Sequence, residues 1–193
     1  MGATTWGGIK KMSESPFLKI AGNTEVQLRV ISEVPHVYKI HYVGEAEETE
    51  RIVCPEANCP ICKMGQGPSV RYAAVVYVRK MKAVKILEGG IQIFGGFRDY
   101  AENEKWGDLR RYDVVVKRVG TGKNDTKYSV MPEPKEPLTK NEIEFIKKNM
   151  VNLSKAYAPL STEEIREKVG GVQTKSENVS TEPDFNAEDE FPG

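Results

Sequence analysis

The chain has 193 residues, of which 39% are hydrophobic, and its 28 basic and 28 acidic residues give no net charge. Its length suits one domain and a tail, and no apolar run approaches the roughly 18 residues of a membrane span. The N-terminus also lacks the charged and apolar regions of a secretory signal. Composition therefore predicts a soluble, intracellular protein without a signal peptide or membrane contact.

Residues 1–15 are predicted to be a flexible lead-in, and strand character begins at Phe17. Alternating or continuous apolar residues predict strands at 26–31, 37–43, 51–53, 70–78 and 82–87, with an acidic turn at 44–50. Ile91, Phe94, Phe97 and Ala101 recur at helical spacing, so a helix is expected at about 90–103.

The strands predicted at 112–119 and 126–131 pair naturally as a hairpin across a Gly-rich turn. Five or six short strands with one inserted helix suit a small closed barrel. The oligonucleotide-binding (OB) fold is a five-stranded Greek-key barrel that commonly has a helix between its third and fourth strands. We therefore expect a mainly β chain with an OB-fold core over 16–132.

The sequence changes character after residue 132. Thr139 with Glu142, and Ser161 with Glu164, form capping boxes that predict two helices. The expected helical extension covers 133–171, with one helix at about 140–150 and a short one that ends at Gly170-Gly171. From 172 to 193 the chain is polar and acidic, which is typical of disorder.

The neutral total hides an asymmetry in charge along the chain. Residues 1–132 carry 20 basic and 15 acidic residues, a net charge of +5, and residues 133–193 carry 8 and 13, a net charge of −5. Residues 57–87 contain six basic residues and no acidic one. A basic body with an acidic tail indicates a polyanionic partner, although ordinary solvated charge fits equally well.

The three cysteines lie close together, which in an intracellular chain indicates a metal rather than disulfides. Cys59 and Cys62 form a Cys-Pro-Ile-Cys knuckle that Cys54 precedes by five positions. A structural zinc ion needs four ligands, and the fourth is one of the two histidines, His36 or His41. We favour His41, because the predicted hairpin brings it beside Cys54. The prediction is one structural Zn²⁺ per chain in an insertion at 36–63.

Two other uses of the cysteines are possible. A redox pair usually opens a helix in an α/β context, which this sequence does not show. A zinc deaminase needs His-x-Glu and Pro-Cys-x-x-Cys motifs, and both are absent. Four protein ligands would also leave no open coordination position for a catalytic water. We therefore expect a structural site and no enzymatic activity.

Aromatic and basic residues alternate along the predicted strands, as they do in single-strand binders, where cations follow the phosphates and rings stack on bases. The candidates are Arg71, Tyr72, Tyr77, Arg79, Lys80, Lys82, Lys85, Tyr112, Lys117, Arg118, Lys127 and Tyr128. Core packing is the alternative for each tyrosine. Tyr72 and Tyr77 lie on opposite faces of one strand, so only one can stack on a base, and we favour Tyr72. Phe94 and Phe97 are assigned to the core.

The sequence resembles the single-stranded DNA-binding proteins of tailed bacteriophages, also called helix-destabilising proteins. The resemblance rests on His41, on the three cysteines that follow it, and on the strand that begins Arg71-Tyr72. Further matches are Lys85-Ile86-Leu87, Gly107-Asp108, Tyr112-Asp113 and Tyr128-Ser129-Val130, within residues 16–132. It implies an OB-fold with a structural zinc, and sequence-independent coverage of single strands in replication, recombination and repair in an infected bacterial cytoplasm.

In such proteins the acidic tail recruits partner enzymes. Here residues 176–193 hold six carboxylates and two phenylalanines, and the candidate partner-binding residues are Asp184, Phe185, Glu188, Asp189, Glu190 and Phe191. The tail is expected to compete with DNA for the basic groove, or to anchor on replication or recombination proteins. The main alternative function for the whole chain is a zinc-ribbon adaptor that binds RNA or a transcription or translation partner.

Overall fold

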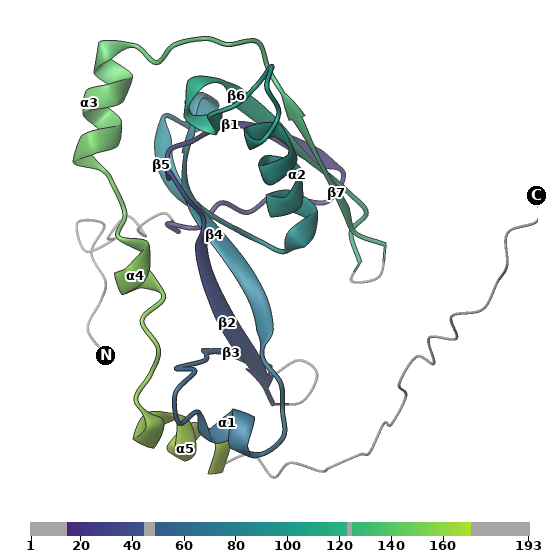
Figure 1. Cartoon of the computed structure of the whole chain (residues 1–193), viewed down its shortest axis with the longest axis vertical. Helices are drawn as coiled ribbons and strands as arrows, with labels where there is room; N and C mark the ends of the chain where they lie inside the picture. Colours follow the sequence, from purple (N-terminus) through teal and green to yellow (C-terminus); the bar gives the residue numbers. More distant parts are fainter. Residues whose placement is uncertain (1–14, 45–48, 123–124, 171–193) are drawn as a thin grey trace, which may run out of the picture.

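The computed structural model describes residues 15–44, 49–122 and 125–170, which form two lobes joined by long strands (Figure 1). The strands are β1 Thr24–Val30, β2 His36–Val43, β3 Glu50–Val53, β4 Ser69–Val78, β5 Ala83–Gly89, β6 Asp113–Val119 and β7 Lys127–Pro132. The helices are α1 Pro60–Lys63, α2 Ile91–Ala101, α3 Lys140–Lys148, α4 Leu153–Ala156 and α5 Thr162–Gly170, with short 3-10 turns η3 Arg79–Met81 and η4 Leu109–Arg111.

The seven strands form one antiparallel sheet in the order β3-β2-β4-β1-β6-β7, with β5 paired to the other edge of β4. The expectation of a mainly β chain is therefore confirmed. The upper lobe in Figure 1 contains β1, β5, β6, β7 and α2, and the lower lobe contains β3, α1 and α5. Strands β2 and β4 run between the two lobes.

Strand β4 is the element that both lobes share. Its first half pairs with β2 through residues 69–73, and its second half pairs with β1 through Val76 and Tyr77 on the same edge. Strand β5 covers the opposite edge from Tyr72 to Val78. A single ten-residue strand therefore carries hydrogen bonds to three neighbours and links the lobes without a hinge.

The sheet is open between β5 and β7, since no ladder joins these two strands within the described residues. The segment that precedes β1 lies along this seam. The Leu18 amide donates to the Ile86 carbonyl at 2.8 Å, and the Arg118 guanidinium donates to the Ile20 carbonyl at 3.1 Å. Helix α2 packs next to the seam, mainly against β7.

The main core lies inside the upper lobe, where β1, β4 and β6 bury alternate side chains against α2. Phe94 and Phe97 are 7% and 4% exposed, which confirms their assignment to the core. Ile91, which shares the helical spacing of these residues, is 63% exposed because the helix begins there, and Ile93 is buried instead. A Cβ at Gly96 would lie 3.0 Å from Val130, so the glycine allows α2 to approach β7 closely.

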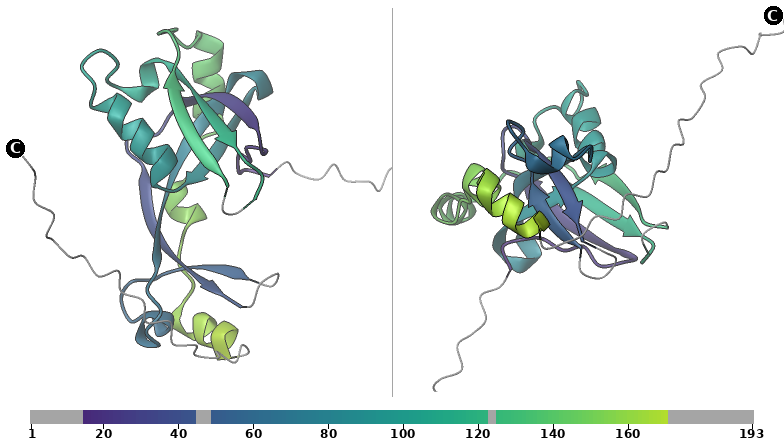
Figure 2. Two further views of the ribbon diagram at one scale, coloured as in Figure 1. Left: turned by 90° about the vertical axis from the view of Figure 1, so that its right-hand side faces the viewer. Right: turned by 90° about the horizontal axis from the view of Figure 1, so that it is seen from below.

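Residues 133–170, which we call the strap, pass from the upper lobe along the joining strands to the lower lobe (Figures 1 and 2). Phe145 of α3 contacts Tyr77, with ring centroids 6.3 Å apart. Tyr157, at the end of α4, is 7% exposed and packs on Tyr38 of β2 at 4.2 Å. Both predicted capping boxes form, and α4 is a helix that the sequence pattern did not predict.

The Glu142 carboxylate fixes the start of α3 within the strap. It accepts hydrogen bonds from the Thr139 amide at 2.8 Å and from Arg79 at 2.6 Å. Burial raises its pKa, but the bonds from Thr139 and the charge of Arg79 outweigh burial, so the pKa lies below its ordinary value. A lowered folded-state pKa stabilises the protein above the unfolded pKa, and this stability is lost as the pH falls through the folded value.

We therefore expect Glu142→Gln to lower the free energy of unfolding by about 1 kcal/mol at neutral pH and by less at acidic pH. Urea unfolding at two pH values measures this difference. Glu144→Gln is the matched control, because Glu144 lies on the exposed side of the same helix. A pH-independent loss in Glu142→Gln, or an equal loss in the control, would contradict the assignment.

None of the helices in the described parts of the chain combines the length and the hydrophobicity needed to cross a lipid bilayer.

Candidate functional site

Four side chains in the lower lobe form a candidate site for a single metal ion. His41 comes from β2, Cys54 follows β3, and Cys59 and Cys62 flank the first turn of α1. Their ligand atoms all lie within 4.8 Å of one another. The structure thus brings together the four residues that the sequence spacing selects, from three separate elements.

Three of the distances within the cluster are close to the edges of a coordination tetrahedron. His41 Nε2 lies 3.4 Å from Cys59 Sγ and 3.5 Å from Cys62 Sγ, and the Sγ atoms of Cys54 and Cys62 are 3.7 Å apart. A tetrahedral zinc with ordinary bond lengths has sulfur–sulfur edges of roughly 3.8 Å and nitrogen–sulfur edges of roughly 3.6 Å. A disulfide needs about 2.05 Å, so the thiols are not paired.

The other histidine lies elsewhere. His36, at the start of β2, stacks on Tyr157 of the strap with ring centroids 5.4 Å apart, and on Tyr38 at 6.0 Å. Of the two histidines that the sequence leaves open, only His41 faces the thiols.

The local backbone explains why these residues converge. Pro60 occupies the first turn of α1, where its missing N–H costs no hydrogen bond. Glu56 and Asn58 have positive φ angles of 60° and 58°, which turn the chain tightly between Cys54 and Cys59. The Glu56 amide points at Cys54 Sγ from 3.4 Å. An amide donor of this kind stabilises a thiolate ligand.

Burial and hydrogen bonding shape the ionisation of the cluster. Burial lowers the pKa of His41, which favours the neutral imidazole that binds metals. Burial raises the pKa of the Cys54 thiol to about 12. Burial also acts on Cys59, but hydrogen bonds from the Cys62 amide and from neighbouring thiols lower its pKa below the usual value. A bound cation would remove the remaining thiol protons, because coordinating thiols ionise outright.

The cluster is enclosed by a small apolar core that includes residues far along the sequence. Cys54 and Cys59 pack with Ile52 and Ile61, which are 2% and 1% exposed. The strap completes this core from the other side, through Ile165 and Val169 of α5, and Lys168 of α5 pairs with Glu50 of β3. The metal cluster and the end of the strap therefore share one core.

The sequence-predicted nucleic-acid residues do not form one surface. Three of them are buried: Tyr77 (4% exposed), Lys85 (6%) and Tyr112 (0%). Tyr77 packs under α3, Tyr112 lies in the upper core, and Lys85 Nζ donates to the Ser15 carbonyl at 2.7 Å. These side chains are not accessible to a nucleic acid, so we remove all three from the candidate surface.

Others are engaged within the fold. Arg79 is held by Asp113 and Glu142, and Arg118 donates to the Ile20 carbonyl. Tyr72 is half-buried and stacks on Phe94 with ring centroids 5.4 Å apart. The remaining candidates are exposed or half-buried, but Lys80 and Lys82 lie at one end of β4, and Lys117, Lys127 and Tyr128 lie on the β6–β7 hairpin.

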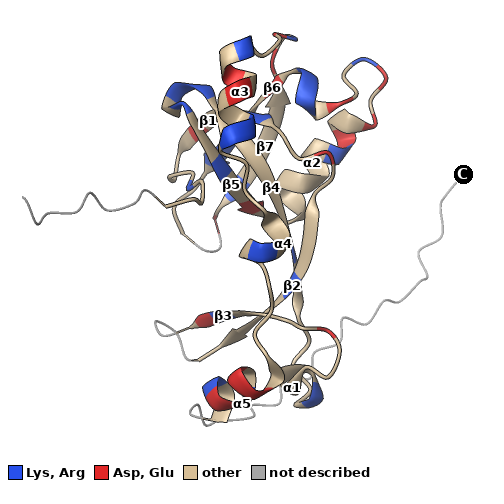
Figure 3. Cartoon of the chain, turned by 90° about the vertical axis from the view of Figure 1, so that its left-hand side faces the viewer, with Lys and Arg blue, Asp and Glu red and all other residues tan. Residues whose placement is uncertain are grey.

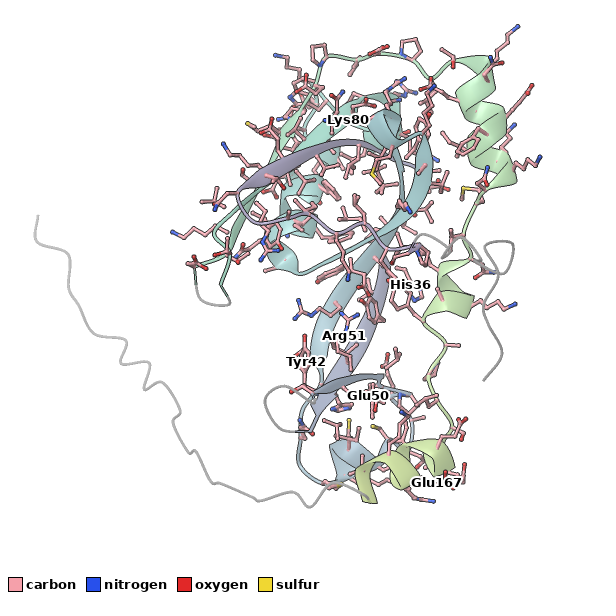
Figure 4. All side chains as sticks on the ribbon, turned by 180° about the vertical axis from the view of Figure 1, so that it is seen from behind. His36, Tyr42, Glu50, Arg51, Lys80 and Glu167 are labelled. Carbon is pink, nitrogen blue, oxygen red and sulfur yellow. The ribbon has the colours of Figure 1, made fainter. Side chains whose placement is uncertain are left out.

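A different group, which we call the interlobe surface, gathers at the other end of β4. It consists of Tyr42, Arg51, Arg71 and Gly90. Arg71 donates to the Tyr42 hydroxyl at 2.6 Å, and a Cβ at Gly90, the N-cap of α2, would lie 3.5 Å from the Arg71 guanidinium. Figure 4 shows Tyr42 of β2 and Arg51 of β3 far from Lys80, which lies at the end of the upper lobe.

Exposure and charge distinguish this surface. The Tyr42 ring is 36% exposed and the Arg51 side chain is 52% exposed. Arg51 contacts Glu88 at 3.3 Å, whereas Arg71 contacts no carboxylate within the described residues. The sequence analysis selected Arg71 but not Tyr42 or Arg51. Tyr42 and Arg51 lie on either side of the acidic turn, and only the pairing of β2 with β3 places these two residues next to each other.

Basic side chains occur mainly on the upper lobe, and α5 of the lower lobe carries mixed charge (Figure 3). The six predicted partner-binding residues of the acidic tail, from Asp184 to Phe191, lie outside the described residues. Comparison of the sequence with known protein families gives no match, and a search of curated proteins finds no similar chain.

Proposed function

We propose that the lower lobe holds one structural Zn²⁺ through His41, Cys54, Cys59 and Cys62. The support is the set of three sulfurs and one imidazole nitrogen within 4.8 Å of one another, with three of their separations close to tetrahedral edges. Sulfur-rich tetrahedral sites are typical of zinc, and hard cations prefer oxygen ligands. Four protein ligands occupy the whole coordination shell, so the metal stabilises the lobe and leaves no position for a substrate.

The strand order supports an OB-type barrel in the upper lobe. In that fold the first strand pairs with the second and fourth, the second with the third, and the fourth with the fifth. The matching ladders here are β1 with β4 and β6, β4 with β5, and β6 with β7. Helix α2 falls between the third and fourth of these strands, and the metal-bearing segment is an insertion between the first and second.

The function that this arrangement supports best is sequence-independent binding of single-stranded DNA, which would protect exposed strands in replication, recombination and repair. The observation that carries it is the interlobe surface, where a partly exposed tyrosine ring is held by Arg71, an arginine at a helix N-terminus that contacts no carboxylate among the described residues. A ring offers stacking to any base, and Arg71 with the α2 N-terminus attracts phosphate.

We expect Tyr42→Ala and Arg71→Ala each to weaken oligo(dT) binding by about 1–3 kcal/mol, because each removes either a stacking platform or a phosphate contact. The Arg71 variant should also reduce the salt dependence of binding, since one fewer counterion is released. Fluorescence titration at two salt concentrations measures both effects.

Lys80→Ala is the matched control, since Lys80 is exposed and basic but lies in η3, beyond the opposite end of β4 and more than roughly 20 Å away at 3.3 Å per strand residue. It should change oligo(dT) affinity little. If Lys80→Ala weakened binding more than Tyr42→Ala and Arg71→Ala, the DNA would lie on the outer end of the upper lobe, and the interlobe assignment would be wrong.

The choice of nucleic acid is tested by titrating the wild-type chain with oligo(dT), duplex DNA and single-stranded RNA. Tightest binding to oligo(dT), with weak binding to duplex, is the expected result. Absence of binding to oligo(dT) at low salt would instead favour the adaptor function, in which the zinc lobe binds RNA or a protein partner.

A further inference from the structure

A cavity of about 490 Å³ lies beneath the start of the strap, where residues 133–139 run along the top of the upper lobe (Figure 1). Four cationic and three apolar residues line it: Arg29, Arg110, Arg111, Lys135, Pro137, Leu138 and Ile143. The cavity is remote from the interlobe surface. Arg29 of β1 pairs with Tyr77 of β4, and Tyr77 is six residues along that strand from Arg71, a distance of roughly 20 Å.

The back wall of the cavity is a fixed arginine. Arg29 is 1% exposed and donates to Asp113 at 2.6 Å and to the carbonyls of Arg110 and Glu136 at 3.1 and 2.6 Å. Each nitrogen of this guanidinium has a partner within the fold, so Arg29 shapes the cavity but does not need a ligand.

The rim of the cavity carries basic side chains, and two of them are not paired with a carboxylate among the described residues. Arg110 is paired with Asp108 at 3.0 Å. Arg111 is exposed and contacts no carboxylate in the described parts of the chain, and Lys135 donates only to the Lys105 carbonyl, at 3.0 Å. Two positive charges therefore remain available to an anionic ligand.

The rest of the lining is aliphatic. Leu138 is half-buried and Ile143 is 39% exposed, and Pro137 lies beside them. No aromatic ring is among the lining residues, so the cavity has no platform for a nucleobase. The chemistry that fits is an acidic peptide segment in which a carboxylate lies next to a large apolar side chain.

We propose that this cavity is the binding site of the chain's own C-terminal segment, Asp184–Phe191. This segment pairs an acid with a phenylalanine twice, in Asp184-Phe185 and in Glu190-Phe191. The phenylalanine enters the aliphatic part of the cavity, and the neighbouring carboxylates pair with Arg111 and Lys135. The 21 residues from 171 to Phe191 can extend to about 70 Å, which gives the segment a long reach from the end of α5.

This site differs from the DNA groove that the sequence alone suggested for the tail. The two predict opposite behaviour toward DNA. A tail in the groove is displaced by oligo(dT), whereas a tail in the cavity under the strap stays bound while the interlobe surface is occupied.

The test uses the full chain with a photo-crosslinking phenylalanine analogue, p-benzoylphenylalanine, in place of Phe191. Peptide mapping after irradiation should find crosslinks to residues 135–143 or 109–111, and saturating oligo(dT) should leave their yield unchanged. The combined variant Arg111→Glu, Leu138→Asp should lower the yield about tenfold, because it removes both an ion pair and an apolar contact. Arg98→Glu, an exposed cation on α2, should leave it unchanged.

A variant in which the charges of two proposed partners are exchanged distinguishes loss of the contact from loss of folding. Arg111→Glu combined with Glu190→Lys should recover crosslinking that Arg111→Glu alone loses. Crosslinks to residues 42–72 that disappear with oligo(dT), or an unchanged yield in the cavity variant, would overturn the proposal. Neither result bears on the proposed function, which is tested separately by the affinity of the wild-type chain for oligo(dT).

Discussion

His41→Ala is expected to abolish stoichiometric metal binding and to unfold the lower lobe. A structural zinc site binds with an apparent free energy of about 10–16 kcal/mol at neutral pH, which is comparable with the whole stability of a domain, about 5–15 kcal/mol. The lower lobe has little else to hold it, because the core around the cluster contains only a few aliphatic side chains from β2, β3, α1 and α5.

The effect should extend to the strap. Ile165 and Val169 are 0% and 8% exposed only because they pack on the metal cluster's core. Loss of the metal should therefore release α5. Limited proteolysis should cut the His41→Ala chain between α4 and α5 well before the wild type, and Cys59→Ser should behave in the same way.

The chain offers a matched control in its other histidine. His36→Ala removes an imidazole that stacks on Tyr38 and Tyr157 but does not face the thiols. Metal analysis of protein purified without added zinc should find about one zinc per chain in wild type and His36→Ala, and almost none in His41→Ala. Equal metal content in the two histidine variants would contradict the ligand assignment.

Asp113→Asn should cause the largest loss of stability in the upper lobe. The carboxylate is 3% exposed and accepts from Arg29 at 2.6 Å and from Arg79 at 2.8 Å. The amide keeps the shape of the side chain but leaves the buried Arg29 charge uncompensated. Removing one partner of a buried ion pair costs about 3–5 kcal/mol, which urea unfolding can measure.

Asp99→Asn provides the comparison, because Asp99 also pairs with an arginine, Arg98, but both side chains are more than 60% exposed. Exposed pairs contribute about 0–1 kcal/mol. Similar losses in the two variants would mean that burial of Asp113 does not determine the strength of its interaction.

The four candidate metal ligands are predictable from sequence because they are local. His41 to Cys62 spans a single hairpin and a knuckle, and the number and spacing of ligands follow from the coordination geometry. The strands and both capping boxes are predictable for the same reason, since alternation and caps are properties of neighbouring residues.

The proposed nucleic-acid surface is less predictable because it depends on which elements cover each face of the sheet. Alternation correctly places Tyr72 and Tyr77 on opposite faces of β4, but it does not reveal that Phe94 covers one face and the strap covers the other. Tyr42 is a residue that the pattern assigns to the same face as Tyr38 and Ile40. It stays 36% exposed, whereas Tyr38 and Ile40 are buried with Tyr157 of the strap, more than 100 residues away in the sequence.

The unbroken β4 strand also has a kinetic consequence. Because it pairs with β2 and β1 along one edge, the lobes cannot open or close around a ligand without breaking backbone hydrogen bonds. The protein should therefore meet a single strand as a preformed surface, with an association rate set by diffusion and ionic steering rather than by a closing step. Stopped-flow traces should then stay single-exponential, with rates that rise linearly with oligo(dT) concentration and show no plateau.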